Sequence, residues 1–141
     1  MDSVRDVMST DVEYCTPLDN VYEVAVKMKD LDVGAIPILE NKKLIGMITD
    51  RDLVVRGYAE KRSGSSKVTD VMSEDLITCT ADTSLEEASR LMAKHQIRRL
   101  PVVENEQLVG ILSLGDLSTN HTSDQYAGDA LSDISEQDQV H

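Results

Sequence analysis

Apolar residues recur at helical spacing in two stretches of the chain. Within residues 20–32 and again within residues 84–95, apolar side chains return every three or four positions, which predicts two amphipathic helices. Residues that favour the N-cap position precede both stretches: Asp19 or Asn20 for the first, and Thr83 or Ser84 for the second.

Short apolar runs in pairs follow each predicted helix. A polar turn separates the two runs of each pair, as expected for hairpins. The predicted strands cover 35–39 and 44–48, then 100–103 and 108–112. A further short strand is expected around Cys15, and a short closing helix near Asp50 and near Leu114. The order strand, helix, strand, strand, helix therefore occurs twice, which is an α+β pattern.

The chain is one unit written twice. A shift of 64 residues aligns residues 4–56 with 68–120 without a gap, and 17 of the 53 aligned positions are identical. A repeated unit of this size usually stacks against its copy to close a core. We therefore divide the chain into repeat 1 (1–57), a polar linker (58–67), repeat 2 (68–120) and a tail (121–141). The tail carries five acidic residues and no Lys or Arg, so it is expected to be largely disordered, with 130–134 as a candidate docking turn.

Composition excludes several classes of function. The net charge is −12, which opposes binding to nucleic acid or to an anionic membrane surface. No apolar run approaches the roughly 20 residues of a membrane span, and the N-terminus does not resemble a signal peptide, so a cytoplasmic protein is expected. Two cysteines, Cys15 and Cys79, are too few for a disulfide framework, and no His, Cys or Asp cluster has metal-ligand spacing. Motifs for catalysis are also missing, so we expect neither a catalytic residue nor a catalytic cofactor, and no enzyme.

Several motifs recur in both copies. Asp-Val-Met begins each unit, Ile36-Pro37 matches Leu100-Pro101, and Gly46-Met47-Ile48-Thr49-Asp50-Arg51-Asp52-Leu53 matches Gly110-Ile111-Leu112-Ser113-Leu114-Gly115-Asp116-Leu117. With these motifs, residues 4 to about 120 resemble a tandem pair of cystathionine β-synthase (CBS) domains, the Bateman module. The resemblance implies two β-α-β-β-α repeats packed about a pseudo-two-fold axis, with two related clefts. It also implies a regulatory protein that binds AMP, ADP, ATP or S-adenosylmethionine there, that forms a homodimer, and that modulates a partner protein which the sequence does not identify.

The family's ligand pattern is Gly, apolar, any residue, Ser or Thr, two of any kind, then Asp. Thr49 and Asp52 match it in repeat 1, and Ser113 and Asp116 match it in repeat 2. A hydroxyl can donate to a phosphate oxygen, and a carboxylate one helical turn later can accept from the hydroxyls of a ribose. The alternative is structural, because the same residues suit an N-cap and the first turn of a helix.

The repeats differ in the loop before the second strand. Repeat 2 has Arg98 and Arg99 where repeat 1 has Gly34 and Ala35. Arginine matches phosphate oxygens well, and by resemblance to nucleotide-binding relatives the arginine pair would contact phosphate. The alternative is a solvated salt bridge to a carboxylate such as Glu104. The two clefts are accordingly expected to be unequal.

The resemblance implies further ligand contacts for the adenine, which lies against apolar strand residues and meets backbone groups in this family. The corresponding residues here are Thr16, Pro17, Thr80, Ile36 and Leu100. Two functions stay open: a sensor of an adenosine ligand, or an interaction module that works through dimerisation with vestigial clefts. The exposed faces of residues 20–32, 50–57 and 84–95 are expected to form the dimer contact.

Overall fold

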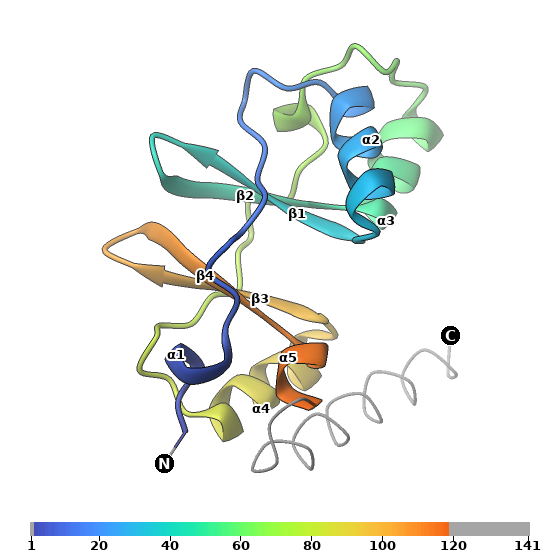
Figure 1. Cartoon of the computed structure of the whole chain (residues 1–141). Coiled ribbons are helices and arrows are strands. Elements are labelled where there is room, and N and C mark those ends of the chain that lie inside the picture. Colours follow the sequence, from blue (N-terminus) through green and yellow to red (C-terminus); the bar gives the residue numbers. More distant parts are fainter. Residues whose placement is uncertain (1, 119–141) are drawn as a thin grey trace, which may run out of the picture. The chain divides into compact units, whose positions relative to one another are not determined.

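The computed structural model describes residues 2–118, and contacts divide the chain into two units (Figure 1). The repeat-1 unit holds residues 13–76, and the repeat-2 unit holds residues 1–12 together with 77–141. The expected disorder of 121–141 and the candidate turn at 130–134 lie outside the described residues. Both units mix helix with antiparallel strands, which confirms the predicted α+β class.

The repeat-1 unit contains one long helix and one hairpin. Its elements are α2 (Val21–Leu31), β1 (Ala35–Glu40), β2 (Lys43–Thr49) and α3 (Asp50–Asp52), a π-helical turn (Leu53–Gly57), and 3-10 turns at Tyr58–Glu60 and Val68–Asp70. Asn20 caps α2 as predicted, because its side chain accepts from Glu23 N at 2.8 Å while Glu23 Oε1 accepts from Asn20 N at 3.0 Å. The helix ends at Asp32, whose φ of 54° stops the right-handed turn.

The repeat-2 unit has the same plan. Its elements are α1 (Val4–Val7), α4 (Leu85–His95), β3 (Arg99–Glu104), β4 (Gln107–Ser113) and α5 (Leu114–Ser118). Of the two candidate caps of α4, Ser84 is the one used, since its hydroxyl accepts from Glu87 N at 3.1 Å. The observed boundaries of the long helices and strands lie within one residue of the predicted ones.

Both hairpins turn through two residues. Asn41 and Lys42 have φ values of 53° and 70°, and Asn105 and Glu106 have 52° and 68°. Positive φ at both central positions is the type I′ geometry, whose twist matches that of the flanking strands. The turn at Asn41 and Lys42 sets the register that pairs Ala35 with Thr49 at the far end of the first hairpin. The turn of the second hairpin likewise sets the register that pairs Arg99 with Ser113.

Each unit is completed by the leading segment of the other repeat. Ser9 exchanges two backbone hydrogen bonds of 2.9 Å with Ile111, so residues 4–9 pack in the repeat-2 unit. Ser73 exchanges bonds of 2.8 and 3.0 Å with Met47, so residues 68–73 pack in the repeat-1 unit. The expected strand at Cys15 is reduced to a single parallel bridge to Ile38. In each unit the hairpin is thus flanked by a cysteine segment on one edge and a leading segment on the other.

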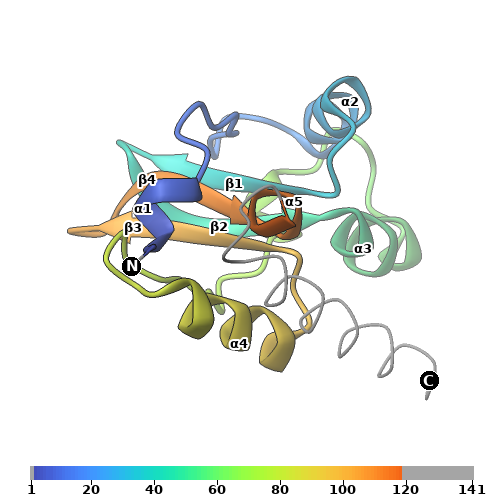
Figure 2. The same cartoon turned by 60° about the horizontal axis from the view of Figure 1, so that its bottom comes forward.

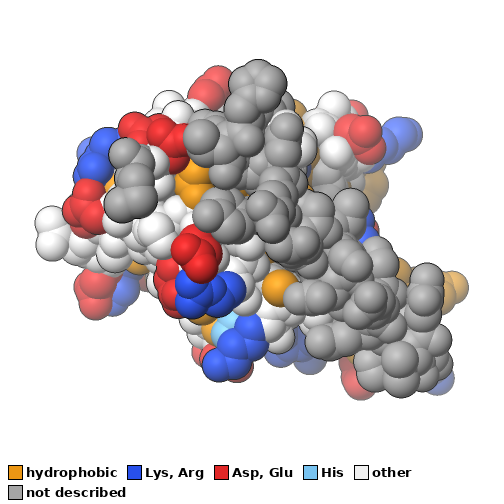
Figure 3. Space-filling view, turned by 90° about the horizontal axis from the view of Figure 1, so that it is seen from below, with side chains coloured by type: hydrophobic (Ala, Val, Ile, Leu, Met, Phe, Trp, Pro, Cys, Tyr) orange, Lys and Arg blue, Asp and Glu red, His pale blue; other side chains and the backbone are white. Residues whose placement is uncertain are grey.

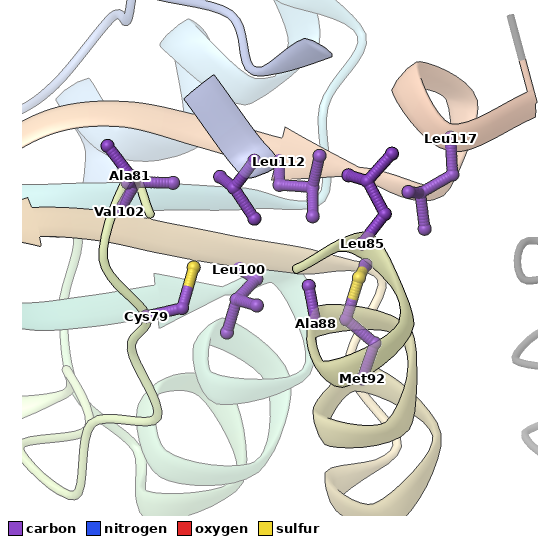
Figure 4. Packing of buried hydrophobic residues seen from close by; sticks show 10 residues of the cluster. Cys79, Ala81, Leu85, Ala88, Met92, Leu100, Val102, Leu112 and Leu117 are labelled. Atoms are coloured by element: carbon purple, nitrogen blue, oxygen red, sulfur yellow. The ribbon is translucent and has the colours of Figure 1, made fainter. Parts of the chain in front are cut away.

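A separate hydrophobic core fills each unit. In the repeat-2 unit, α4 lies along the hairpin β3–β4 and inserts Leu85, Ala88 and Met92 against Leu100 and Leu112 (Figures 2 and 4). The repeat-1 core is built from the equivalent elements: Cys15, Val24, Met28, Ile36, Ile38, Ile48, Val68, Val71 and Met72. Within residues 2–118, no helix is both long and apolar enough to cross a bilayer.

Candidate functional site

The same turn joins the second hairpin strand to the following helix in both units. Thr49 Oγ1 accepts from Asp52 N at 3.0 Å, and Asp52 Oδ2 accepts from Thr49 N at 3.0 Å. Ser113 and Asp116 repeat these bonds at 3.0 and 2.9 Å. All four residues are partly exposed. The structural alternative for these residues is therefore realised, because each pair forms a capping box.

Capping leaves chemistry available for a ligand. The capping hydroxyl acts as an acceptor in this box, so its own hydrogen can point to another acceptor. A carboxylate has two oxygens, and the hydrogen bond from Thr49 N is made to Oδ2 of Asp52. The box also holds the hydroxyl and the carboxylate in fixed positions at the partly exposed end of the strand. Ligand contact by Thr49, Asp52, Ser113 and Asp116 stays a prediction.

The loop after the long helix reaches the same turn in each unit. Asp50 N donates to Gly34 O at 2.9 Å, and Leu114 N donates to Arg98 O at 3.2 Å. Loop, strand end and helix start thus form one local surface. We call this surface turn site 1 in the repeat-1 unit (residues 34–35 and 49–52) and turn site 2 in the repeat-2 unit (residues 98–99 and 113–116).

Turn site 2 places both arginines at the surface. Arg98 is exposed and Arg99 is partly exposed. Among the described residues, no salt bridge joins Arg98 or Arg99 to Glu104. Glu104 Oε1 instead accepts from Ala81 N at 3.0 Å. Figure 3 shows Lys and Arg side chains next to a histidine on one face of the molecule, with Asp or Glu side chains bordering them. The two arginines of turn site 2 thus stand at the surface of a chain whose net charge is −12.

Thr16, Pro17 and Thr80 lie away from the turn sites of their own units. Leu39 N donates to the carbonyl of Cys15 at 2.8 Å, which sets Thr16 and Pro17 beside the turn end of the first hairpin. Val103 N donates to Cys79 O at 2.9 Å, which places Thr80 in the same way. Residues 49 and 113 sit at the opposite hairpin ends, about four residues or roughly 13 Å away. Thr16, Pro17 and Thr80 are thus not brought to the turn site of their own unit, and adenine contact by these residues stays a prediction.

The side chains of Ile36 and Leu100 are buried in the cores of their own units, and ligand contact by these residues stays a prediction. Their exposed fractions are 1% and 0%, and each packs in the core of its own unit. A ligand could touch these side chains only if the core opened. Ile36 lies on β1 and Leu100 on β3, each directly after the loop of its turn site, so their packing anchors that loop on the core.

The motif glycines have a packing role. A Cβ added to Gly110 would lie 2.7 Å from Met8 Sδ and 2.9 Å from the carbonyl oxygen of Ser9. A Cβ on Gly46 would overlap Met72 Sδ and lie 3.1 Å from Ser73 O. Both contacts are made by a leading segment, so glycine is needed where that segment crosses the strand.

The side chain that sequence reasoning overlooked is Asp50. Its Oδ1 accepts from Arg51 N at 2.8 Å, and its Oδ2 would lie 3.1 Å from a Cβ on Gly34. An exposed carboxylate therefore stands over the loop of turn site 1. The signal was present in the repeat alignment, where Asp50 is opposite Leu114.

The two cysteines and possible clusters of metal-ligating side chains are the remaining candidates for a chemical role. Cys15 and Cys79 are free and buried, and desolvation raises the pKa of each thiol to about 11. Such thiols are unreactive near neutral pH. In the part of the chain that the structure describes, no three His, Cys, Asp or Glu side chains gather in a way that could hold a metal ion.

Comparison with known proteins defines the class. The CBS domain model matches residues 4–57 and 68–120, so this chain belongs to the CBS-domain family and carries two tandem CBS repeats. It is a CBS-domain regulatory module.

Particular relatives resemble it over most of their length. Protein YlbB of Bacillus subtilis strain 168 is 52% identical over 140 residues, which cover 98% of this chain and 95% of YlbB. The crystal structure of Hypoxic Response Protein I with two coordinated zinc ions has a TM-score of 0.78 and 30% identity, and the match covers 84% of this chain and 98% of that one. The crystal structure of CBSX2 in complex with AMP has a TM-score of 0.74 and 28% identity, over 82% and 93% of the two chains.

Proposed function

We propose that this protein senses an adenosine-containing ligand at its turn sites and regulates a partner protein according to whether the ligand is bound. The candidates are AMP, ADP, ATP and S-adenosylmethionine. The observation that carries the proposal is turn site 2, where a hydroxyl, a carboxylate and two arginines meet at one surface. The AMP complex of CBSX2, a related protein, gives the ligand class independent support.

Each group has a distinct task in this proposal. Arg98 and Arg99 neutralise and bind phosphate oxygens through charged hydrogen bonds, each worth about 1.5–3 kcal/mol. Ser113 donates its hydroxyl hydrogen to the same phosphate, and Asp116 accepts from the ribose hydroxyls. Binding regulates a partner only if the ligand has different affinities for two states of the protein. None of these tasks includes a bond-breaking step, so we propose a regulator and not an enzyme.

Thermal unfolding against a ligand panel tests the sensor. AMP, ADP, ATP and S-adenosylmethionine would be compared with GMP, and a true ligand at 100 times its Kd should add about 2.7 kcal/mol of stability. Arg99→Ala and Asp116→Asn should abolish that shift. Arg90→Ala is the matched control, because Arg90 is an exposed arginine of the same unit that pairs with Glu86 on α4. Unchanged melting with every ligand at millimolar concentration would contradict the sensor.

A second candidate function, an interaction module acting as a homodimer, is favoured by an uneven surface. The described large apolar side chains that are exposed all belong to the repeat-1 unit: Tyr14, Leu18, Tyr22, Leu31, Val54, Val55 and Tyr58. Their counterparts in repeat 2 are polar: Thr78, Asp82, Glu86, His95, Ser118, Thr119 and Thr122. Of the three faces expected to form the dimer, 20–32 and 50–57 are thus suited to contact, whereas 84–95 carries exposed ion pairs of Arg90 with Glu86 and Glu87.

Sedimentation velocity tests the homodimer. Tyr22→Glu and Val54→Ser, each introducing the repeat-2 residue, should shift the protein to monomer, while Glu86→Gln on α4 should not. A parent protein that sediments as a monomer at high concentration would contradict dimerisation. We also propose a cytoplasmic location, which the two free buried cysteines support, and the division into repeats 1–57 and 68–120 with the linker 58–67.

A further inference from the structure

The two turn sites have the same backbone and opposite charge. Both have the loop-to-helix hydrogen bond and the complete capping box, with lengths that agree within 0.3 Å. Any difference in ligand choice must therefore come from side chains. The positions that differ in charge pair Gly34 with Arg98, Ala35 with Arg99, Asp50 with Leu114 and Arg51 with Gly115.

Turn site 1 carries a fixed negative charge on its loop. The Asp50 carboxylate is held by its bond to Arg51 N and covers the face of Gly34. An arginine at position 34 would be crowded there, since its Cβ would already lie 3.1 Å from Asp50 Oδ2. The small loop residue and the carboxylate thus occur together. A phosphate entering this loop would meet an anion instead of a guanidinium.

Turn site 2 has the reverse arrangement. Leu114, partly buried, replaces the carboxylate, and two guanidiniums stand on the loop. Over all charged residues of the two sites, site 1 (Asp50, Arg51 and Asp52) carries −1 and site 2 (Arg98, Arg99 and Asp116) carries +1. A difference of two unit charges, with both guanidiniums of site 2 on the loop, favours an anionic group at site 2.

We propose that the protein binds one phosphate-bearing adenosine ligand per chain, at turn site 2, and that Asp50 makes turn site 1 selective for an adenosine ligand that carries no phosphate. This inference rests on the proposed sensor function. Asp52, held like Asp116, keeps the ribose contact in site 1, so the base and sugar are still recognised there. Specificity comes from a repulsive charge as much as from an attractive one.

Isothermal titration of the parent protein gives the first test. AMP should bind with a stoichiometry of one per chain, and adenosine should then bind once more in the presence of saturating AMP. Two equivalent AMP sites would overturn the inference while supporting the sensor. One AMP site and no adenosine binding would overturn the assignment of turn site 1. No binding of either compound would overturn the inference, and the full ligand panel then decides the proposed function.

Exchanging the loop residues gives the second test. Arg98→Gly with Arg99→Ala should weaken AMP binding by about 100-fold or more and leave one adenosine site intact. Gly34→Arg, Ala35→Arg and Asp50→Leu together should create a second AMP site. The control Asp30→Leu with Glu60→Arg changes net charge by the same three units at exposed positions outside the loop and should leave one AMP site. A triple variant that keeps one AMP site while retaining the parent's circular dichroism would overturn the role of Asp50; if it fails to fold, the arginine variant decides.

Discussion

Replacing Gly110 by alanine tests why each ligand motif begins with glycine. The added methyl would lie 2.7 Å from Met8 Sδ and 2.9 Å from Ser9 O, against an ordinary contact of 3.4 Å or more. Met8 is a flexible side chain and can move. Ser9 O cannot move freely, because it accepts from Ile111 N while Ser9 N donates to Ile111 O, both at 2.9 Å.

The expected loss of stability follows from these contacts. Overpacking costs about 1–3 kcal/mol. Each weakened backbone hydrogen bond costs up to about 1 kcal/mol. Alanine recovers about 0.5–1 kcal/mol of the strand cost of glycine. The sum is a destabilisation of about 2 kcal/mol with an upper bound of about 4.5 kcal/mol, and for a chain of this size about 2 kcal/mol lowers the Tm by roughly 6–8 °C.

Calorimetry and amide exchange measure the two parts of this prediction. The Tm gives the total, and faster exchange at the Ile111 amide reports displacement of the leading segment. Gly115→Ala is the matched control, since its nearest neighbour would be Ser113 Oγ at 3.6 Å and the helix should gain about 0.5–1 kcal/mol. If Gly110→Ala melted like Gly115→Ala, the packing explanation of the motif glycine would be wrong.

Three further predictions concern stability. Ser113→Ala removes the cap of α5 and should cost about 0.5–2 kcal/mol in chemical denaturation, restored by Ser113→Thr. Arg5→Ala should leave the denaturation midpoint nearly unchanged in the same assay, because its 2.6 Å ion pair with Asp82 is exposed on both sides. Burial raises the pKa of Cys15 and Cys79 to about 11. The folded state therefore holds these protons longer than the unfolded state, so stability should fall between pH 9 and 11 by up to about 1.4 kcal/mol per pH unit for each thiol. A double Cys→Ala variant with an undiminished slope would contradict that assignment.

Local patterns were enough to predict the long elements. The helices begin at Asn20 and Ser84 because capping is decided by neighbours three residues apart, and hairpins turn where a polar pair follows an apolar run. The turn pairs Thr49–Asp52 and Ser113–Asp116 were predicted as chemistry and as caps for the same reason, since one short turn contains every group involved.

Pairing between segments that are far apart in the chain could not be predicted from the sequence. The leading segments carry Asp-Val-Met in both repeats, yet nothing in that pattern says that Ser9 pairs with Ile111 instead of packing on its own repeat. The parallel bridges of Cys15 to Ile38 and of Cys79 to Val102 had the same ambiguity. Register along an edge depends on contacts distant in sequence, and two similar repeats offer two comparably apolar choices.

Folding alone accounts for every position of the repeated ligand motif. The glycine lets a leading segment cross the strand, and the hydroxyl and carboxylate cap the next helix. A chain could therefore keep the motif in both repeats without binding anything. Arg98, Arg99 and Asp50 have no such structural need, because all three are at least partly exposed at turn sites whose backbone hydrogen bonds are the same in both units. Ligand choice must then be sought where the repeats differ, and the exchange of these loop residues is the experiment that separates binding from folding.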